Sequence, residues 1–177
     1  MTEPQSEQQP SKRWFLIAFI AVTLGVTGIS LWTNLSRMWG TPPAEARGPA
    51  AGQETLEIVT VSGRHKFNVD VMRTDADRAK GLMFRQSMPQ DYGMLFDFAA
   101  DVNVMMWMKN TYISLDMVFI KADGTVHRVE PRTETLSERT IPAGAPVRSV
   151  LELNAGVADK IGLKPGDRIQ HKMFPAK

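Results

Sequence analysis

An uninterrupted apolar run near the N-terminus constrains this chain most, because a segment of that length and composition has few stable environments. Residues 14–32 read WFLIAFIAVTLGVTGISLW and contain no charged side chain. At a rise of about 1.5 Å per residue, a helix of this length spans about 28 Å, close to the hydrocarbon thickness of a bilayer. Lys12 and Arg13 precede the run and favour a cytoplasmic N-terminus. We therefore predict a single transmembrane anchor at 14–32, with residues 1–13 in the cytoplasm.

A cleaved signal peptide is the alternative interpretation of this region. Ala44-Glu45-Ala46 has the small-x-small pattern of a signal-peptidase site, but it lies about a dozen residues beyond the apolar run, which is far for cleavage. Residues 33–53, rich in Pro, Ala and Gly, are expected to form a flexible tether. Both interpretations place residues 54–177 in the periplasm or an equivalent extracytoplasmic space. The uncleaved anchor in the inner (cytoplasmic) membrane is the interpretation that the spacing favours.

Charge and cysteine content exclude several functional classes for the exported part. Residues 54–177 carry 17 Lys and Arg against 16 Asp and Glu, so they lack the basic footprint of a nucleic-acid-binding protein. The chain has no cysteine, which excludes disulfides, thiolate zinc sites and a cysteine nucleophile. His65, His127 and His171 do not have metal-ligand spacing. We predict no nucleic-acid partner, no metal site and no cofactor.

Local patterns after the tether predict mostly β structure. Apolar residues alternate with polar ones at 56–61 and at 67–71, and a Ser-Gly turn signal separates the two runs, which predicts a β-hairpin. A short helix is expected to begin at Thr74, where Asp77 three residues later completes a capping-box-like pair. This helix is expected to end near Gly81.

The remaining segments extend the β prediction to the C-terminus. Alternating or continuous apolar runs predict further strands at 94–98, 104–108, 113–121, 125–130, 150–153 and 167–171. The polar stretch 132–149 is expected to be a loop crossing, and 155–162 a helical turn. Many short strands with closely spaced turn signals are typical of a sandwich or barrel. The predicted fold class is therefore mainly β, a sandwich or barrel with one or two short helices, preceded by one transmembrane helix.

Specific sequence motifs within this region are similar to a known family. They are RAKGLMFRQSM, GMLFDF and MMWMKNTYISLDMVFI between Arg78 and Ile120, followed by SVLELNAG and LKPGDRI. In this order they resemble the bacterial and archaeal family catalogued as domain of unknown function number one hundred and ninety-two, across 54–171. The resemblance implies a compact β-rich fold, often behind an export signal, and no assigned catalysis.

Polar residues that interrupt two apolar strands are the main candidates for a binding site. Trp107, Lys109 and Asn110 follow one apolar run, and Asp116 lies in the next. An indole face beside amine, amide and carboxylate groups could orient a polar ligand such as a sugar. Alternatively, Asn110 caps a turn and Asp116 forms a structural ion pair with an arginine.

Two arginines beside the short helix complete the predicted site. Arg78 and Arg85 could clamp a carboxylate or phosphate, although a solvated helix face is the favoured explanation. The leading hypothesis is a membrane-tethered binding or accessory module whose partner is a small polar ligand or an envelope protein. Its predicted ligand-binding residues are Arg78, Arg85, Trp107, Lys109, Asn110 and Asp116.

Two other functions remain open at this point. An envelope enzyme would use Asp116 as its acid or base and Lys109 as an electrostatic stabiliser. A Cu(I)-binding protein would use Met106 and Met108, because alternate residues of a strand share a face and thioethers are soft ligands. Methionines of an apolar run are otherwise simple core filler.

Overall fold

The computed structural model of the protein describes residues 52–175. The predicted cytoplasmic segment, the predicted anchor and all but the last two residues of the predicted tether lie outside this range. Among the described residues, no helix is long and apolar enough to cross a bilayer.

The predicted N-terminal hairpin forms from β1 (Glu54–Thr60) and β2 (Gly63–Met72). The two strands are antiparallel, and Thr60 pairs with Gly63 at the turn. Leu56 and Ile58 are fully buried while the residues between and beside them are more exposed, as the period-2 pattern predicted. The hairpin prediction is therefore confirmed.

The predicted short helix is α2 (Asp75–Lys80). The Thr74 hydroxyl accepts a hydrogen bond from the Asp77 backbone N–H over 3.1 Å, which satisfies one of the free donors of the first turn. The helix ends at Gly81, whose φ of +46° is in the left-handed region. The helix begins and ends where the sequence predicted, so this prediction is also confirmed. Both signals are local, which is why the sequence was sufficient.

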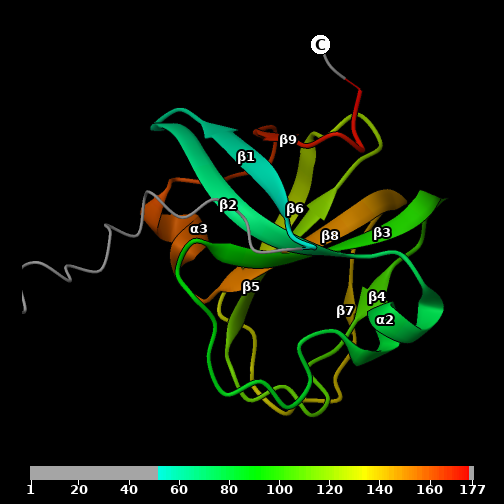
Figure 1. Cartoon of the computed structure of the whole chain (residues 1–177). Coiled ribbons are helices and arrows are strands. Elements are labelled where there is room, and N and C mark those ends of the chain that lie inside the picture. The colour runs from blue at the N-terminus through cyan, green and yellow to red at the C-terminus, as the bar shows by residue number, and fades with distance from the viewer. Residues whose placement is uncertain (1–51, 176–177) are drawn as a thin grey trace, which may run out of the picture. The chain divides into compact units, whose positions relative to one another are not determined.

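Seven strands form one curled sheet, which Figure 1 shows as a half-barrel. The strand order is β6-β5-β8-β3-β2-β1-β9. The additional strands are β3 (Tyr92–Val102), β5 (Leu115–Ile120), β6 (Val126–Glu130), β8 (Val147–Asn154) and β9 (Arg168–Gln170). Every neighbouring pair is antiparallel except β2–β3, which is parallel and is connected through α2. The mainly β prediction is confirmed, and a half-barrel takes the place of the expected sandwich or closed barrel.

One segment differs from its predicted structure. The expected strand 104–108 is only two residues long, β4 (Met105–Met106), and it pairs with β7 (Ile141–Pro142) in a separate two-stranded sheet. Strand β7 lies inside the predicted loop crossing 132–149, which also contains the start of β8. The local sequence is polar and rich in proline, so only pairing with distant β4 makes this segment a strand.

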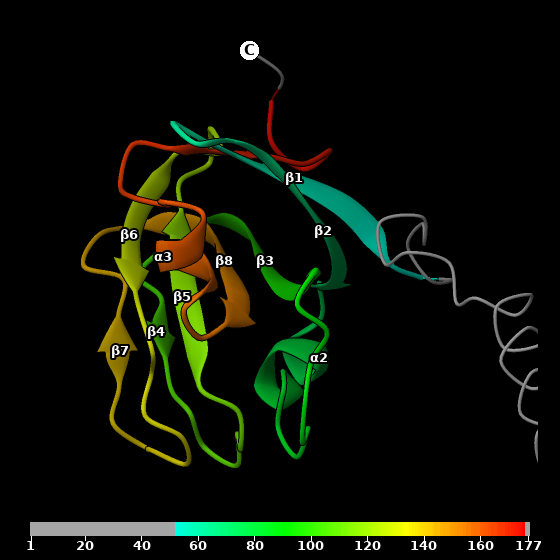
Figure 2. The same cartoon turned by 90° about the vertical axis from the view of Figure 1, so that its left-hand side faces the viewer.

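The curled sheet has a core on each face. One cluster contains Leu56, Ile58 and Leu151 and is covered by α3 (Val157–Lys160), which Figure 2 shows lying over β5 and β8. The other cluster contains Phe96 and Met117, together with residues of β4, β7 and the loops beside them. Side chains of successive strand residues therefore enter different cores, and the pairing register decides which residues share a face.

Candidate functional site

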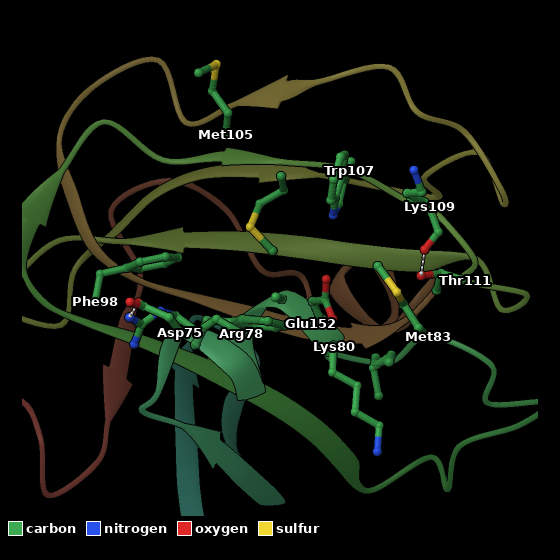
Figure 3. Close-up of a pocket in the computed structure, with 15 residues that line it drawn as sticks. Asp75, Arg78, Lys80, Met83, Phe98, Met105, Trp107, Lys109, Thr111 and Glu152 are labelled. Atoms are coloured by element: carbon green, nitrogen blue, oxygen red, sulfur yellow. Dashed lines mark hydrogen bonds and ion pairs between the residues drawn. The ribbon is translucent and has the colours of Figure 1, made fainter.

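The candidate site is a pocket of about 310 Å³ on the second face of the sheet. It lies between α2, the end of β3, β4 and the loop after β4, with β8 behind it (Figure 3). This volume is at the lower end of the range of small-ligand sites. Its walls are mostly aromatic rings and thioethers, and its rim carries basic side chains.

Glu152 provides the acidic group of this pocket. In β8 it pairs on one side with Met94 of β3 and on the other with Met117 of β5, so it lies among apolar neighbours on the pocket face. The residue is 4% exposed, and within residues 52–175 its carboxyl makes no hydrogen bond or ion pair. Burial raises the pKa of Glu152 to about 8, because a carboxylate is poorly solvated there. This carboxyl is therefore expected to be protonated at neutral pH.

Glu152 is not among the predicted site residues. It lies in the predicted strand 150–153, within the motif SVLELNAG, whose other strand residues are apolar. One signal could have identified it: a glutamate between Leu151 and Leu153 in a strand buried on both faces is an unusual buried charge.

Trp107 and Lys109, both predicted site residues, are brought together at this pocket. Trp107 is 46% exposed, and the Lys109 amine lies 5.5 Å from the centre of its ring. The same amine is 3.3 Å from a carboxylate oxygen of Glu138. The segment is fixed by a 2.9 Å hydrogen bond from the Met108 N–H to the Ser137 carbonyl. The ring and the amine are thus positioned by contact with the loop before β7.

Arg78 also lines the pocket, but most of its donors are occupied. Its guanidinium donates to the backbone carbonyls of Arg73 and Asp97, over 2.6 and 2.7 Å, and forms an ion pair with Asp75. It lies 5.4 Å from the centre of the Phe98 ring. Because the side chain is only 20% exposed, a solvated helix face does not describe it. Arg78 joins α2 to β3 and forms one wall.

Arg85 lies apart from this pocket and lines a neighbouring hollow. It donates to the Tyr92 hydroxyl over 3.1 Å and lies 3.4 Å from an Asp70 carboxylate oxygen. The Tyr92 hydroxyl itself donates to Asp70 over 2.5 Å. Burial, with this hydrogen bond, raises the pKa of Tyr92 well above its ordinary value, so the phenol stays protonated.

Asp116 points away from the pocket, to the opposite face of the sheet. Asp116 pairs with Leu153, the residue after Glu152, so the Asp116 and Glu152 side chains lie on opposite faces of the sheet. Its buried carboxylate accepts hydrogen bonds from the Arg132 N–H over 2.9 Å and from the Ala158 N–H over 2.8 Å. The structure therefore does not bring Asp116 beside Lys109, as the enzyme hypothesis required, and the expected ion pair of Asp116 with an arginine near α2 does not form.

Asn110 has a structural position beside the pocket rather than a place in its lining. Its φ of +53° is in the left-handed region, which asparagine tolerates well. Its backbone carbonyl accepts a 2.8 Å hydrogen bond from the Phe84 N–H. Asn110 therefore lies in a turn, but its side-chain amide donates to the Met83 sulfur over 3.9 Å and does not cap the turn through a backbone group.

The two methionines of the copper hypothesis are separated by the end of β4. Met106 lines the pocket, whereas Met108 is buried in the core and its sulfur accepts a 3.2 Å hydrogen bond from the Thr133 hydroxyl. The strand ends at Met106, so the assumed strand alternation does not continue to Met108. In residues 52–175 there is also no cluster of three His, Asp or Glu side chains able to hold a metal ion.

Comparisons with known proteins agree with this fold. A family model described as uncharacterised ACR, domain of unknown function 192, matches residues 57–171, which confirms the predicted resemblance. No curated protein matches the chain. A protein from Sinorhizobium meliloti 1021, provisionally described as a transcription regulator, is 42% identical with a TM-score of 0.68; the match covers 73% of this chain and 100% of that one. A protein of unknown function from Novosphingobium aromaticivorans DSM 12444 is 37% identical with a TM-score of 0.68, covering 75% of this chain and 99% of that one.

The Sinorhizobium comparison also bears on independent folding. That crystal structure is matched over its whole length by only part of this chain. That protein is folded with a chain of about this length, and residues 53–177, which contain both core clusters, are the fragment for experiments.

Proposed function

Because this chain belongs to the domain of unknown function 192 family, whose description names no activity, we propose a function from the pocket itself. We propose that the domain is a membrane-anchored, extracytoplasmic binding module for a small ligand. The observation that carries the proposal is Glu152, a buried carboxyl without a partner among the described residues, facing a pocket of about 310 Å³.

Burial of an unpaired polar group costs free energy, so such a group commonly has a binding role. Glu152 offers one donor and one acceptor when protonated, and Trp107 adds a large partly exposed ring at the pocket mouth. These features are typical of a small-ligand site, which combines apolar walls with a few polar groups. The pocket around Glu152 and Trp107 supports binding more directly than the predicted site did, because Asp116 faces the opposite side of the sheet.

The anchor and the location belong to the same proposal. They are supported by the charge-free run 14–32 and by the basic residues Lys12 and Arg13 before it. The near-neutral charge of residues 54–177 gives no reason to extend the provisional description of the Sinorhizobium protein to this chain. We therefore propose a membrane-tethered protein without a nucleic-acid partner.

Tryptophan fluorescence and thermal unfolding of residues 53–177 test the binding function. Trp107 is the only tryptophan in this fragment, so its emission reports directly on the pocket. We expect at least one class in a panel of amines, organic acids, sugars and nucleotides to raise the melting temperature. A ligand that binds only the native state adds about 2.7 kcal/mol at a hundredfold excess over its Kd.

The pocket assignment is tested with variants. Glu152→Gln and Trp107→Ala are expected to abolish the shift, while Arg85→Gln, which changes the neighbouring hollow, is expected to keep it. A panel without any shift, or a shift that is insensitive to both pocket variants, would contradict the proposed function.

A further inference from the structure

We propose that the pocket binds a small organic cation, a primary ammonium or guanidinium on a short apolar chain, with the cationic group against the carboxylate of Glu152. The inference rests on the proposed binding function and specifies its ligand class. It follows from three features of the pocket: the charges around Glu152, the nature of the walls and the protonation of the empty site.

The groups that face Glu152 do not include a counter-ion. Its strand neighbours Met94 and Met117 are apolar. Figure 3 shows the amines of Lys80 and Lys109 directed away from Glu152. Lys109 is paired with Glu138 instead, at 3.3 Å.

The remaining charged residues of the pocket come from α2 and neutralise each other. Asp75 forms an ion pair with Arg78, which also donates to two backbone carbonyls. None of the described cations pairs with Glu152, and a ligand cation would supply the missing partner. An anionic ligand would instead meet a carboxyl with no cation facing it.

The walls also favour a cation over an anion. Phe98 and Trp107 present aromatic rings, and Met83 and Met106 present polarisable thioethers. Aromatic faces attract cations through their quadrupole. Arg78 and Lys109 lie over Phe98 and Trp107, at 5.4 and 5.5 Å from the ring centres, so a ligand cation must use the ring surface that these two side chains leave open. A short alkyl chain fits the apolar lining and the volume of about 310 Å³.

The protonation of Glu152 gives this binding a characteristic pH dependence. Burial raises its pKa to about 8, so the empty site carries a proton at neutral pH. When an ammonium ion binds, the Glu152 O–H bond breaks, the proton passes to solvent and the carboxylate pairs with the ammonium. Affinity therefore increases with pH, by about tenfold per unit below the pKa of the empty site. A neutral hydrogen-bond acceptor would show the reverse dependence, because it requires the protonated carboxyl.

The experiment compares three probes of similar size on residues 53–177: n-butylammonium, butan-1-ol and butanoate. Binding is followed by Trp107 fluorescence and by backbone amide chemical shifts, with affinities of about 1 mM expected for ligands this small. We expect n-butylammonium to bind most tightly and its Kd to fall by about 50-fold between pH 6 and pH 8. This result does not depend on any variant.

Variants then assign the effect to one carboxyl. Glu152→Gln is nearly isosteric and should weaken n-butylammonium binding at pH 8 by more than about tenfold and remove the pH dependence. Glu134→Gln, which neutralises an exposed carboxylate outside the pocket lining, should leave both unchanged. The amide spectrum of each variant establishes that it is folded.

The outcomes separate the ligand class from the binding function. If butan-1-ol or butanoate binds in a Glu152-dependent manner and n-butylammonium does not, the cation is the wrong class and the binding function stands. A flat or inverse pH dependence for n-butylammonium also overturns the cation assignment. If none of the three probes perturbs the pocket signals at about 100 mM, the cation class fails, and the broader ligand panel then decides whether the binding function stands.

Discussion

Two carboxyl groups on neighbouring strands, Glu152 and Asp116, differ in their hydrogen-bond partners although both are almost fully buried. Asp116 accepts two backbone hydrogen bonds, from Arg132 and Ala158, and so has partners for its charge. Glu152 has none among the described residues, and the pocket opens above it. At the residue scale, hydrogen-bond partners rather than burial distinguish a structural carboxylate from a candidate binding group.

The raised pKa of Glu152 predicts a specific pH dependence of stability. The carboxyl has an ordinary value near 4.5 in the unfolded chain and about 8 in the folded domain. Between these values only the folded state keeps the proton, so stability falls as pH rises, by up to about 1.4 kcal/mol per unit. We expect Glu152→Gln to gain stability relative to the wild type by about 1 kcal/mol per unit from pH 5 to pH 8. Urea unfolding of both proteins across this range measures the difference.

The control for this prediction is Glu138→Gln, because Glu138 is exposed and is not in the sheet. An equally large rise for Glu138→Gln would show that the effect is not specific to Glu152. A pH-independent difference for Glu152→Gln would mean that the carboxyl is ionised in the folded domain and would remove the basis of the pH argument.

Asp116 is expected to matter for stability and not for binding. Asp116→Ala removes the acceptor of two buried N–H groups, and we expect the free energy of unfolding to fall by about 2–4 kcal/mol. Asp116→Asn keeps one acceptor oxygen and should cost less. Urea titration gives the ranking, and n-butylammonium binding to the folded Asn variant should equal that of the wild type. If the Asp116→Asn variant lost binding while keeping its stability, Asp116 would instead be a binding residue.

At the scale of elements, β8 is central to both the fold and the pocket. It lies between β5 and β3, and its alternating side chains enter both cores. Close packing against β3 depends on Gly93, where an added Cβ would be 2.9 Å from the Glu152 carbonyl oxygen. A glycine is therefore required here by the approach of two backbones.

Gly93→Ala is expected to destabilise the domain by about 1–3 kcal/mol, because the sheet must separate locally to admit the methyl group. Gly144→Ala is a useful comparison, since nothing lies within 4 Å of the added Cβ and only its φ of +84° opposes the change. That variant should cost about 1 kcal/mol. Equal stability of the Gly93→Ala variant and the wild type in urea would show that β3 and β8 can separate freely.

For the whole molecule, the proposed anchor predicts how the chain behaves in cells. The full chain should sediment with membranes and resist alkaline carbonate extraction, because the run 14–32 is long enough to span the bilayer. Residues 53–177 expressed alone should stay in the supernatant. Protease added outside spheroplasts should reach the domain if the N-terminus is cytoplasmic. A released form that begins near Ala46 would instead favour the cleaved signal peptide.

The elements that could be predicted from the sequence are those whose stabilising contacts are local. The hairpin of β1 and β2 follows from alternation and a glycine turn, and α2 follows from Thr74 at its start and Gly81 at its end. The mainly β class and the family could be read for the same reason, because turn signals and motifs are properties of short segments. Trp107 and Lys109, two of the predicted residues, line the pocket because both follow the short strand β4 directly.

Features that depend on pairing between distant segments could not be predicted from the sequence. Strand β7 is a strand because it pairs with β4, and the parallel pairing of β2 with β3 has no local signal. The same holds for the site: the register of β8 against β3 and β5 places Glu152 in the pocket and Asp116 on the other face. Because a shift of one residue exchanges the two faces of a strand, a one-dimensional pattern could not tell which carboxyl the pocket would contain.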